Sequence, residues 1–279
     1  MNVLMPNTLA EACELCAKQP DLIPLAGATD LLVHWPLRQV EHDKTYLDLS
    51  KVGELRKMTW TADTIVLGAL TTYWDVLQDL RAKSEFPLLM ESARQVGAIQ
   101  IQSRGTWAGN IANGSPAADG VPVLMAYDAS VTLTSKSGSR SVPLHEYYTG
   151  YRKSVRRPDE LISSISMPLR KYDYSVFHKV GARRAQAITK IGLAITREAS
   201  APSGWRIVAN SVAATVKRCP AIEQLLQSGL PIRRPEDFST AIASDVTPID
   251  DIRSTADYRR TVMARLLYHS LRGTAASIS

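Results

Sequence analysis

The chain has 279 residues, of which 45% are hydrophobic and 22% charged, a composition ordinary for a globular protein with a sizeable core. No apolar run approaches the ~20 residues of a membrane helix, and residues 1–16 lack the basic region of a secretory signal, so we expect a cytoplasmic protein without a membrane span. The net charge is +6, but the densest basic stretch, at 151–160, ends in acids and lacks interleaved aromatics. We interpret it as a solvated loop or protein-docking patch and expect no nucleic-acid partner.

The chain has only three cysteines, Cys13, Cys16 and Cys219, and this small number limits the metal and redox sites that it can form. The spacing CELC is formally that of a redox pair or half a zinc site, but Leu9, Cys13 and Cys16 share one face of a predicted helix. We therefore favour a buried structural thiol pair. The five histidines show no paired spacing that would complete a zinc site, and three cysteines cannot hold an all-cysteine iron–sulfur cluster, so we expect no metal site.

The first part of the chain mixes helices and strands. In chain order we expect a helix at 9–18, a strand, small-residue turn and apolar stretch at 21–35, strands at 45–50 and 64–70, helices at 72–83 and 86–97, loop-like residues at 98–114, a helix at 120–129, and strands at 130–135 and 160–169. A domain boundary follows near residue 170, where Pro168 precedes the charged stretch RKYDY. This order indicates an α+β fold rather than a doubly wound parallel sheet.

The second part contains strands and then helices. We expect strands at 174–180, 190–198 and 205–216, and helices at 220–229 and 254–273. For the last helix we predict a capping box of Ser254 and Asp257, and a core-facing stripe of Tyr258, Val262 and Leu266.

Several common catalytic motifs are missing, and two small-residue segments remain. No G-x-G-x-x-G follows a strand, and G-x-x-x-x-G-K-[ST], G-x-S-x-G and H-E-x-x-H do not occur, so Rossmann, P-loop, hydrolase and zinc-protease functions have no support. The segments LAGATD (25–30) and TWAGN (106–110) offer backbone N–H groups with little side-chain cover, and the second is followed by Ser115–Pro116 at an expected helix start. Together they predict paired anion-binding sites around a pyrophosphate, although either alone is equally typical of a tight turn.

These two segments and FHKVGARRAQAITKIGLA (177–194) resemble the FAD-binding medium subunits of the molybdenum hydroxylases, a family that includes xanthine dehydrogenase and carbon monoxide dehydrogenase. The resemblance extends from near residue 8 to near residue 260. It implies a PCMH-type, vanillyl-alcohol-oxidase-like FAD-binding domain at 1–170, with α+β subdomains at about 1–55 and 56–170. A small α+β domain with a short antiparallel sheet is implied at 171–279.

The resemblance also implies which residues hold the FAD pyrophosphate. Two segments would bind it through backbone amides: Leu25, Ala26, Gly27, Ala28, Thr29 and Asp30 in the first, and Thr106, Trp107, Ala108, Gly109 and Asn110 in the second. None of these residues is implied to be catalytic.

Four further positions are implied to contact FAD. Ser115 begins the segment S-P-x-[AS]-D, whose acid, Asp119, would bind the adenosine or ribityl end. Ile162 would lie against the isoalloxazine, and Lys179 near the edge of the flavin. No convincing residue for covalent attachment lies beside the loops, His34 being the nearest candidate, so we expect FAD to be bound non-covalently.

The sequence departs from the family pattern at Ala28 and Ala108, where the family has glycine. If those positions require a positive φ, each alanine costs about 1 kcal/mol. We favour a negative φ at both, because a positive φ would strain the loops and weaken FAD binding. A chain that had lost the site would have little reason to keep the other matched residues together. Trp107 stands in place of an aliphatic residue, and we favour a core position for it over packing on the cofactor.

The function implied is that of the FAD-binding electron-transfer subunit of a molybdenum hydroxylase, which is an oxidoreductase. Its partners would be a large subunit that holds the molybdopterin and a small subunit that holds the iron–sulfur clusters, and it would deliver electrons to an external acceptor. The alternative is a scaffold subunit that keeps the fold but has lost tight flavin binding through the two departures.

Overall fold

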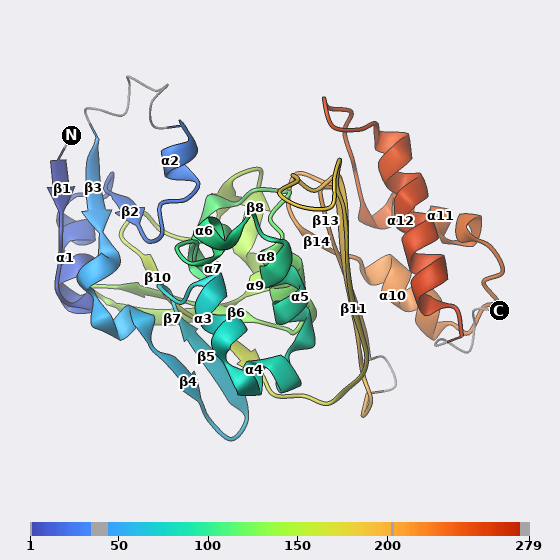
Figure 1. Cartoon of the computed structure of the whole chain (residues 1–279), viewed down its shortest axis with the longest axis horizontal. Helices are drawn as coiled ribbons and strands as arrows, with labels where there is room; N and C mark the ends of the chain where they lie inside the picture. The colour runs from blue at the N-terminus through green and yellow to red at the C-terminus, as the bar shows by residue number, and fades with distance from the viewer. Residues whose placement is uncertain (1, 35–43, 202–203, 274–279) are drawn as a thin grey trace.

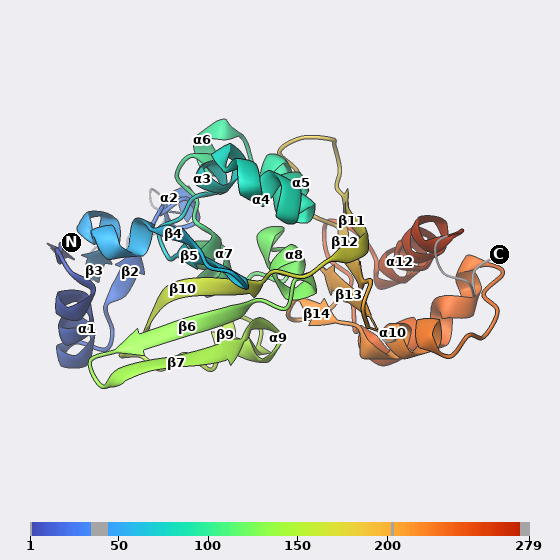
Figure 2. The ribbon, with the colours of Figure 1, turned by 90° about the horizontal axis from the view of Figure 1, so that it is seen from below.

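The structure is a computed structural model that describes residues 2–34, 44–201 and 204–273. Three main sheets follow one another along the long axis, from the N-terminal end to the C-terminal end (Figure 1). A run of short helices covers the second sheet, and longer helices close the far side of the third (Figure 2).

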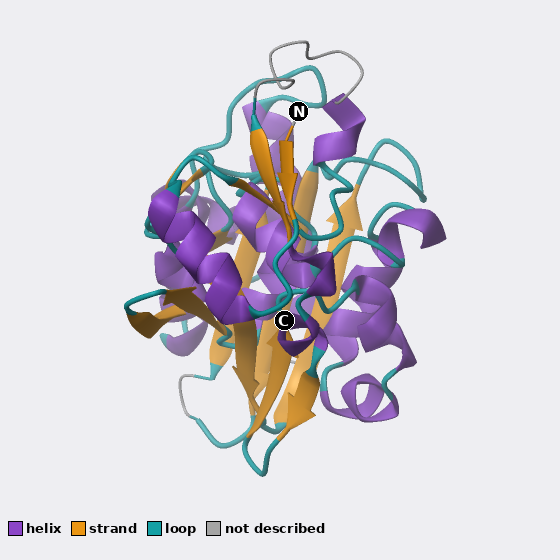
Figure 3. Cartoon of the chain, turned by 90° about the vertical axis from the view of Figure 1, so that its left-hand side faces the viewer, coloured by secondary structure: helices purple, strands orange, loops and turns teal. Residues whose placement is uncertain are grey.

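The first sheet is parallel, with strand order β1-β3-β2, and lies in front in the view from the N-terminal end (Figure 3). Helix α1 packs against strand β6 of the next sheet, and the Sγ of Cys13 donates to the carbonyl oxygen of Thr134 at 3.7 Å. Cys13 and Cys16 are both buried, which confirms the burial predicted for this thiol pair. The elements here are β1 (Asn2–Leu4), α1 (Leu9–Lys18), β2 (Ile23–Leu25), α2 (Leu31–His34), β3 (Thr45–Asp48) and the 3-10 turns η3 (Leu49–Lys51) and η4 (Gly53–Arg56).

The second sheet is antiparallel, with strand order β4-β5-β10-β6-β7. The alternation of SVTLTS in β6 turns Val131 and Leu133 fully into the core, as the period of two predicts. Strand β10 contains a bulge between Ile162 and Ser164. The strands are β4 (Met58–Trp60), β5 (Thr64–Gly68), β6 (Ser130–Ser135), β7 (Gly138–Pro143) and β10 (Leu161–Pro168), beside the small pair β8 (Tyr148–Gly150) and β9 (Lys153–Ser154).

The helices over the second sheet differ from expectation in two places. The single helix expected at 72–83 is broken at Asp79, whose carboxylate caps a second helix by accepting from the N–H of Ala82 at 2.6 Å. The loop expected at 98–114 instead contains two helices. The helices are α3 (Tyr73–Gln78), α4 (Leu80–Glu85), α5 (Pro87–Gln95), α6 (Ile99–Gln102), α7 (Trp107–Asn113), α8 (Gly120–Ala126) and α9 (Leu144–Tyr147).

The third sheet is antiparallel, with strand order β11-β12-β13-β14. Helices α5 and α8 pack on one face and α10 and α12 on the other, so β12 is buried on both faces (Figure 1). Thr255 caps α12 in place of the predicted Ser254–Asp257 box. The elements are β11 (Tyr172–Val180), β12 (Ile191–Glu198), β13 (Trp205–Asn210), β14 (Lys217–Arg218), α10 (Pro220–Gln227), η5 (Pro235–Phe238), α11 (Ser239–Asp245) and α12 (Ala256–Leu271).

Two hydrophobic cores lie on the two sides of this third sheet. The predicted core stripe of α12 is wrong by one position, because Tyr258 is 42% exposed while Met263 and Leu267 are fully buried. Val262 and Leu266 are only partly buried. In the described part of the chain, no helix is long and apolar enough to cross a membrane.

Candidate functional site

The two small-residue segments meet in the structure. Gly27 packs against the carbonyl group of Arg104, so closely that a Cβ at Gly27 would lie 1.8 Å from that oxygen. A Cβ at Gly105 would lie 3.3 Å from the hydroxyl of Thr29. The Nδ2 of Asn113 then donates to the Oδ1 of Asp30 at 3.1 Å. Gly27 is therefore needed for the close approach of the two segments to each other.

The second segment is a helix start rather than a loop. Thr106 is the N-cap of α7, and its Oγ1 accepts from the N–H of Gly109 at 2.9 Å. The expectation that Ser115–Pro116 starts the next helix is also wrong, because α8 begins at Gly120. The Oδ1 of Asn110 accepts from the N–H of Gly120 at 3.2 Å, which ties the two helices together.

The two departures from glycine have different conformations. Ala28 has φ +56°, in the left-handed region, so our preference for a negative φ is wrong at this position. Ala108 lies inside α7 and has no positive φ, so the same preference is confirmed there. Left-handed backbone is strained for alanine, but it also turns successive N–H groups toward one side, as in an anion-binding nest.

Unpartnered backbone donors lie on both segments. Among the described residues, the N–H groups of Gly27, Ala28, Thr29 and Ala108 have no hydrogen-bond acceptor. Beyond its own helix backbone, a Cβ at Gly109 would meet only the Thr106 hydroxyl within 4 Å, so there is open space beside Gly109, although Trp107 and Ala108 before it are buried. These donors fit the diphosphate of a dinucleotide cofactor, which needs several N–H groups and no nearby unpaired carboxylate.

Trp107 is a core residue, as we favoured. Its side chain is fully buried, and its ring lies 4.6 Å from that of Tyr73. The phenol of Tyr73 has no hydrogen-bond partner in the described part of the chain, and burial raises its pKa. Its oxygen lies 3.0 Å from the position that a Cβ of Gly120 would take, so it faces the start of α8.

Asp119 and Lys179 are paired with each other. The Nζ of Lys179 lies 2.6 Å from the Oδ2 of Asp119, and the two side chains are 7% and 13% exposed. Thr189 donates its hydroxyl to the Oδ1 of Asp119 at 2.5 Å, and Lys179 also donates to the carbonyl oxygen of Gln95 at 2.8 Å. Burial raises the pKa of Asp119, while Lys179 and Thr189 oppose that rise. The structure thus brings these two expected cofactor residues together.

The other expected residues lie around this centre. Leu25 ends β2 and is half-buried, and Ala26 packs against the main core. The Oγ of Ser115 accepts from the N–H of Ala117 at 3.2 Å. Ile162 is 8% exposed and belongs to the main core. Their contacts with a cofactor stay predictions.

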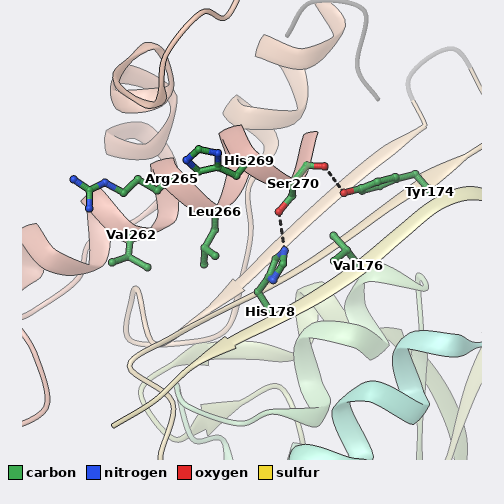
Figure 4. Close-up of a pocket in the computed structure, with 8 residues that line it drawn as sticks. All are labelled: Tyr174, Val176, His178, Val262, Arg265, Leu266, His269 and Ser270. Carbon is green, nitrogen blue, oxygen red and sulfur yellow. Dashed lines mark hydrogen bonds between the residues drawn. The ribbon is translucent and has the colours of Figure 1, made fainter. Parts of the chain in front are cut away.

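A cavity of about 300 Å³ lies elsewhere, between β11 and α12 (Figure 4). Its walls include Val176, Val262 and Leu266, which explains why the predicted stripe of α12 is not fully buried. At one end, Ser270 accepts from the hydroxyl of Tyr174 through its carbonyl oxygen at 2.5 Å, and its Oγ lies 2.7 Å from the Nε2 of His178. Those polar groups satisfy one another, and none of the expected FAD residues lines this cavity.

The basic stretch at 151–160 is partly neutralised. The carboxylate of Glu160 is 1% exposed and forms a bidentate pair with Arg140, at 2.7 and 2.9 Å. The Nη2 of Arg157 lies 2.9 Å from the same carboxylate, and these donors lower the pKa of Glu160 to about 2. Part of the positive charge therefore belongs to a structural ion pair.

Two family models cover nearly all of the chain. The model described as "FAD binding domain in molybdopterin dehydrogenase" matches residues 1–170, and that described as "CO dehydrogenase flavoprotein C-terminal domain" matches residues 176–274. The chain belongs to the FAD-binding family of the molybdopterin dehydrogenases. The resemblance found in the sequence is confirmed, and the cofactor of this flavoprotein is FAD.

Individual proteins similar to this chain are also flavoprotein or medium subunits of dehydrogenases, or chains of such enzymes. The flavoprotein is 28% identical over 271 residues to the glyceraldehyde dehydrogenase medium chain of Sulfolobus acidocaldarius, with 96% of each chain covered. It is 30% identical over 261 residues to the xanthine dehydrogenase FAD-binding subunit of Escherichia coli O157:H7, covering 90% of this chain and 88% of the relative. A chain of carbon monoxide dehydrogenase from Hydrogenophaga pseudoflava matches with a TM-score of 0.86 and 25% identity, over 99% and 96% of the two chains. The predicted α+β fold and oxidoreductase class are confirmed.

Sequence reasoning missed three polar residues of this region. Thr189 and Asn210 are 1% and 0% exposed, and they contact Asp119 and Ala118 respectively. Arg259 is 4% exposed and donates to the carbonyl oxygen of Ser211, the residue after Asn210. Thr189 lies inside the segment that carried the resemblance, where a polar residue before an apolar strand was the available signal.

Proposed function

We propose that this flavoprotein is the electron-transfer subunit of a molybdenum hydroxylase complex, and that it accepts electrons from a small iron–sulfur subunit and passes them to an external acceptor. A large subunit holds the molybdopterin in this proposal. The family of the chain supports it, as do relatives whose names describe medium chains and an FAD-binding subunit. The three cysteines are all buried and cannot hold an all-cysteine cluster, so the clusters are placed on another chain.

The observation that carries the proposal is the meeting of the two small-residue segments. FAD, when bound, supplies the capacity to take up and release electrons. The N–H groups of Gly27, Ala28, Thr29 and Ala108 would hold its diphosphate. Asp119 would accept a hydrogen bond from a cofactor hydroxyl.

The remaining expected residues would complete the site. Leu25, Ala26 and Ile162 would supply apolar contacts, and Lys179 would place a positive charge near the flavin. Because these contacts are all non-covalent, we propose that acid or denaturant releases the cofactor intact. Residues 1–170 would form the FAD-binding domain, with subdomains at about 1–55 and 56–170, and residues 171–279 the C-terminal domain.

The first experiment tests the site. In the full chain, Asp119→Ala should weaken FAD binding by about 1.5–3 kcal/mol, the range for hydrogen bonds to charged groups. Asp79→Ala is the matched control, because Asp79 also precedes a helix but lies in the cap of α4. It should lose about 1 kcal/mol of stability without changing FAD affinity. An Asp119→Ala variant with unchanged affinity and a lower melting temperature would assign Asp119 to structure alone.

The second experiment tests electron transfer. The tagged chain should purify with a large molybdopterin subunit and a small iron–sulfur subunit when the three are co-expressed. Mixing the FAD-loaded chain with a dithionite-reduced small subunit, freed of excess dithionite, should bleach the visible flavin absorption. A chain that stays colourless after incubation with excess FAD would instead support the scaffold alternative.

A further inference from the structure

We propose that Thr189 is a positioning residue for FAD, because its hydroxyl holds the carboxylate of Asp119 in the orientation that receives the cofactor. The inference rests on the proposed function, in which Asp119 accepts a hydrogen bond from FAD. Thr189 lies in the C-terminal domain, between β11 and β12, while Asp119 lies at the start of α8. The second domain would thus set the geometry of a site built mainly from the first.

The contacts of Asp119 show where its orientation comes from. Asp119 occupies the N-cap position of α8, yet its side chain makes no capping hydrogen bond. Its Oδ1 accepts from Thr189 at 2.5 Å and its Oδ2 from Lys179 at 2.6 Å. Both donors belong to the C-terminal domain, so the direction of this carboxylate is set from outside its own helix.

The segment around Asp119 is held by the same domain. The N–H of Ser211 donates to the carbonyl oxygen of Pro116 at 2.7 Å, and the Nδ2 of Asn210 donates to that of Ala118 at 2.8 Å. The Oγ of Ser211 donates to the carbonyl oxygen of Thr189 at 2.9 Å. Thr189 and the segment it contacts are therefore fixed by one short stretch of chain at the end of β13.

Arg259 fixes that stretch in turn. Its Nη1 donates to the carbonyl oxygens of Ser211 and Lys190, at 2.5 and 3.0 Å, and its Nη2 pairs with Asp251 at 2.8 Å. Ser211 itself has φ +62°, a conformation that an L-residue keeps only when its surroundings hold it. Thr189 is thus a well-fixed donor and not a surface hydroxyl that happens to reach Asp119.

A hydroxyl in this position has a specific effect on the carboxylate. With one donor on each oxygen, the remaining lone pairs of Asp119 point in defined directions. Without Thr189, the Oδ1 of Asp119 loses its short hydrogen bond, and the terminal torsion of the side chain, which has a broad energy minimum, is held mainly by Lys179. A cofactor hydroxyl would then have to restrain the carboxylate on binding, and that ordering lowers the affinity.

The experiment compares three variants of the full chain. Thr189→Val removes the hydroxyl at nearly constant shape, and Thr189→Ser keeps it. Thr196→Val is the matched control, because Thr196 is also fully buried on β12 and donates across the same interface, to the carbonyl oxygen of Ala126 at 2.9 Å. The dissociation constant of FAD is measured by fluorescence titration of the deflavinated chain, beside the melting temperature.

The expected result separates positioning from stability. Thr189→Val should bind FAD about tenfold more weakly, which is ~1.4 kcal/mol, and Thr189→Ser should stay within about threefold of the wild-type chain. Thr196→Val should lose a similar amount of stability but keep its FAD affinity within about twofold. Equal affinities for Thr189→Val and Thr196→Val would overturn the inference.

A double variant tests whether Thr189 acts through Asp119. In an Asp119→Ala background, Thr189→Val should weaken FAD binding no further. A full additional loss would overturn the inference, because Thr189 would then act by another route. A wild-type chain that binds no FAD would contradict the proposed function itself, so the two failures are distinguishable.

The pH dependence of FAD binding gives a second readout. The groups that face Asp119 are Lys179 from β11, Asn210 from β13, Tyr73 from α3 and Thr189. Thr189 lowers the pKa of Asp119, so its removal raises that pKa. Affinity that depends on the charged carboxylate falls as the pH drops, and this fall should begin at a higher pH in Thr189→Val than in Thr196→Val. Coincident pH profiles would overturn the inference.

Discussion

Ala28 and Ala108 are two alanines at family glycine positions, and we predict that Ala→Gly changes stability in opposite directions at the two sites. Ala28 has φ +56°, while Ala108 is helical and 4% exposed. Glycine at position 28 relieves a left-handed penalty. At position 108 it removes a buried methyl group and a good helix former.

The magnitudes follow from these conformations. At Ala28, relief of about 1–2 kcal/mol is offset by ~0.4–1 kcal/mol of added unfolded-chain entropy, which leaves the variant more stable by about 0.5 kcal/mol. At Ala108, glycine costs about 1 kcal/mol in helix propensity and up to ~0.8 kcal/mol for the lost methyl burial. The two single variants should therefore differ by about 2 kcal/mol.

Urea unfolding of the cofactor-free chain measures this difference directly. FAD affinity should stay within about threefold in both variants, because the strain at Ala28 is present with and without the cofactor and cancels from binding. An Ala28→Gly variant less stable than the wild-type chain would refute the stability argument. A tenfold or greater gain in FAD affinity would refute the cancellation and show that the strained loop binds loosely.

Two further predictions concern packing and charge. Gly27→Ala should lose more than about 3 kcal/mol of unfolding free energy in chemical denaturation, because its Cβ would meet the carbonyl oxygen of Arg104 at 1.8 Å. Gly53→Ala is the control: nothing lies within 4 Å of its Cβ, so its unfolding free energy should change by less than ~0.5 kcal/mol. Glu160 has a pKa lowered to about 2, so its stabilising effect is complete above its usual pKa of 4.5 and is lost as the pH falls toward 2. Glu160→Gln should be about 3 kcal/mol less stable at pH 7, and thermal melts should show this difference vanishing near pH 2; a constant difference would contradict the assigned ion pair.

The sequence predicted the long strands well, because their apolar patterns are strong. The run IGLAIT in β12 is buried on both faces, and such a run indicates a strand between two layers. Helix α7 was missed because Gly109, Asn110 and Gly114 are typical of turns. Its formation depends on the Thr106 cap and on burial of Trp107, and those tertiary contacts override a weak local preference.

The site could be predicted only as separate pieces of chain. The motifs pointed to Asp119 and Lys179 individually, but the two are 60 residues apart and their pairing depends on how the domains pack. The signal at Thr189, a polar residue before an apolar strand, was too weak to single it out, because a threonine in that position has many uses. The positive φ of Ala28 was also hidden, because alanine seldom adopts it and the sequence records no backbone angle.

Helix α8 is fastened to the C-terminal sheet at both ends. Asp119 meets Lys179 at its start, and beyond its end Asp128 pairs with Arg206 on β13 at 3.0 Å. A truncated gene product ending at residue 170 would lose both cations and expose the apolar side of α8 that packs on β12 and β13. The boundary between the two family modules is thus a poor place to cut this protein, and recombination that exchanges only one module between relatives should yield chimaeras that aggregate.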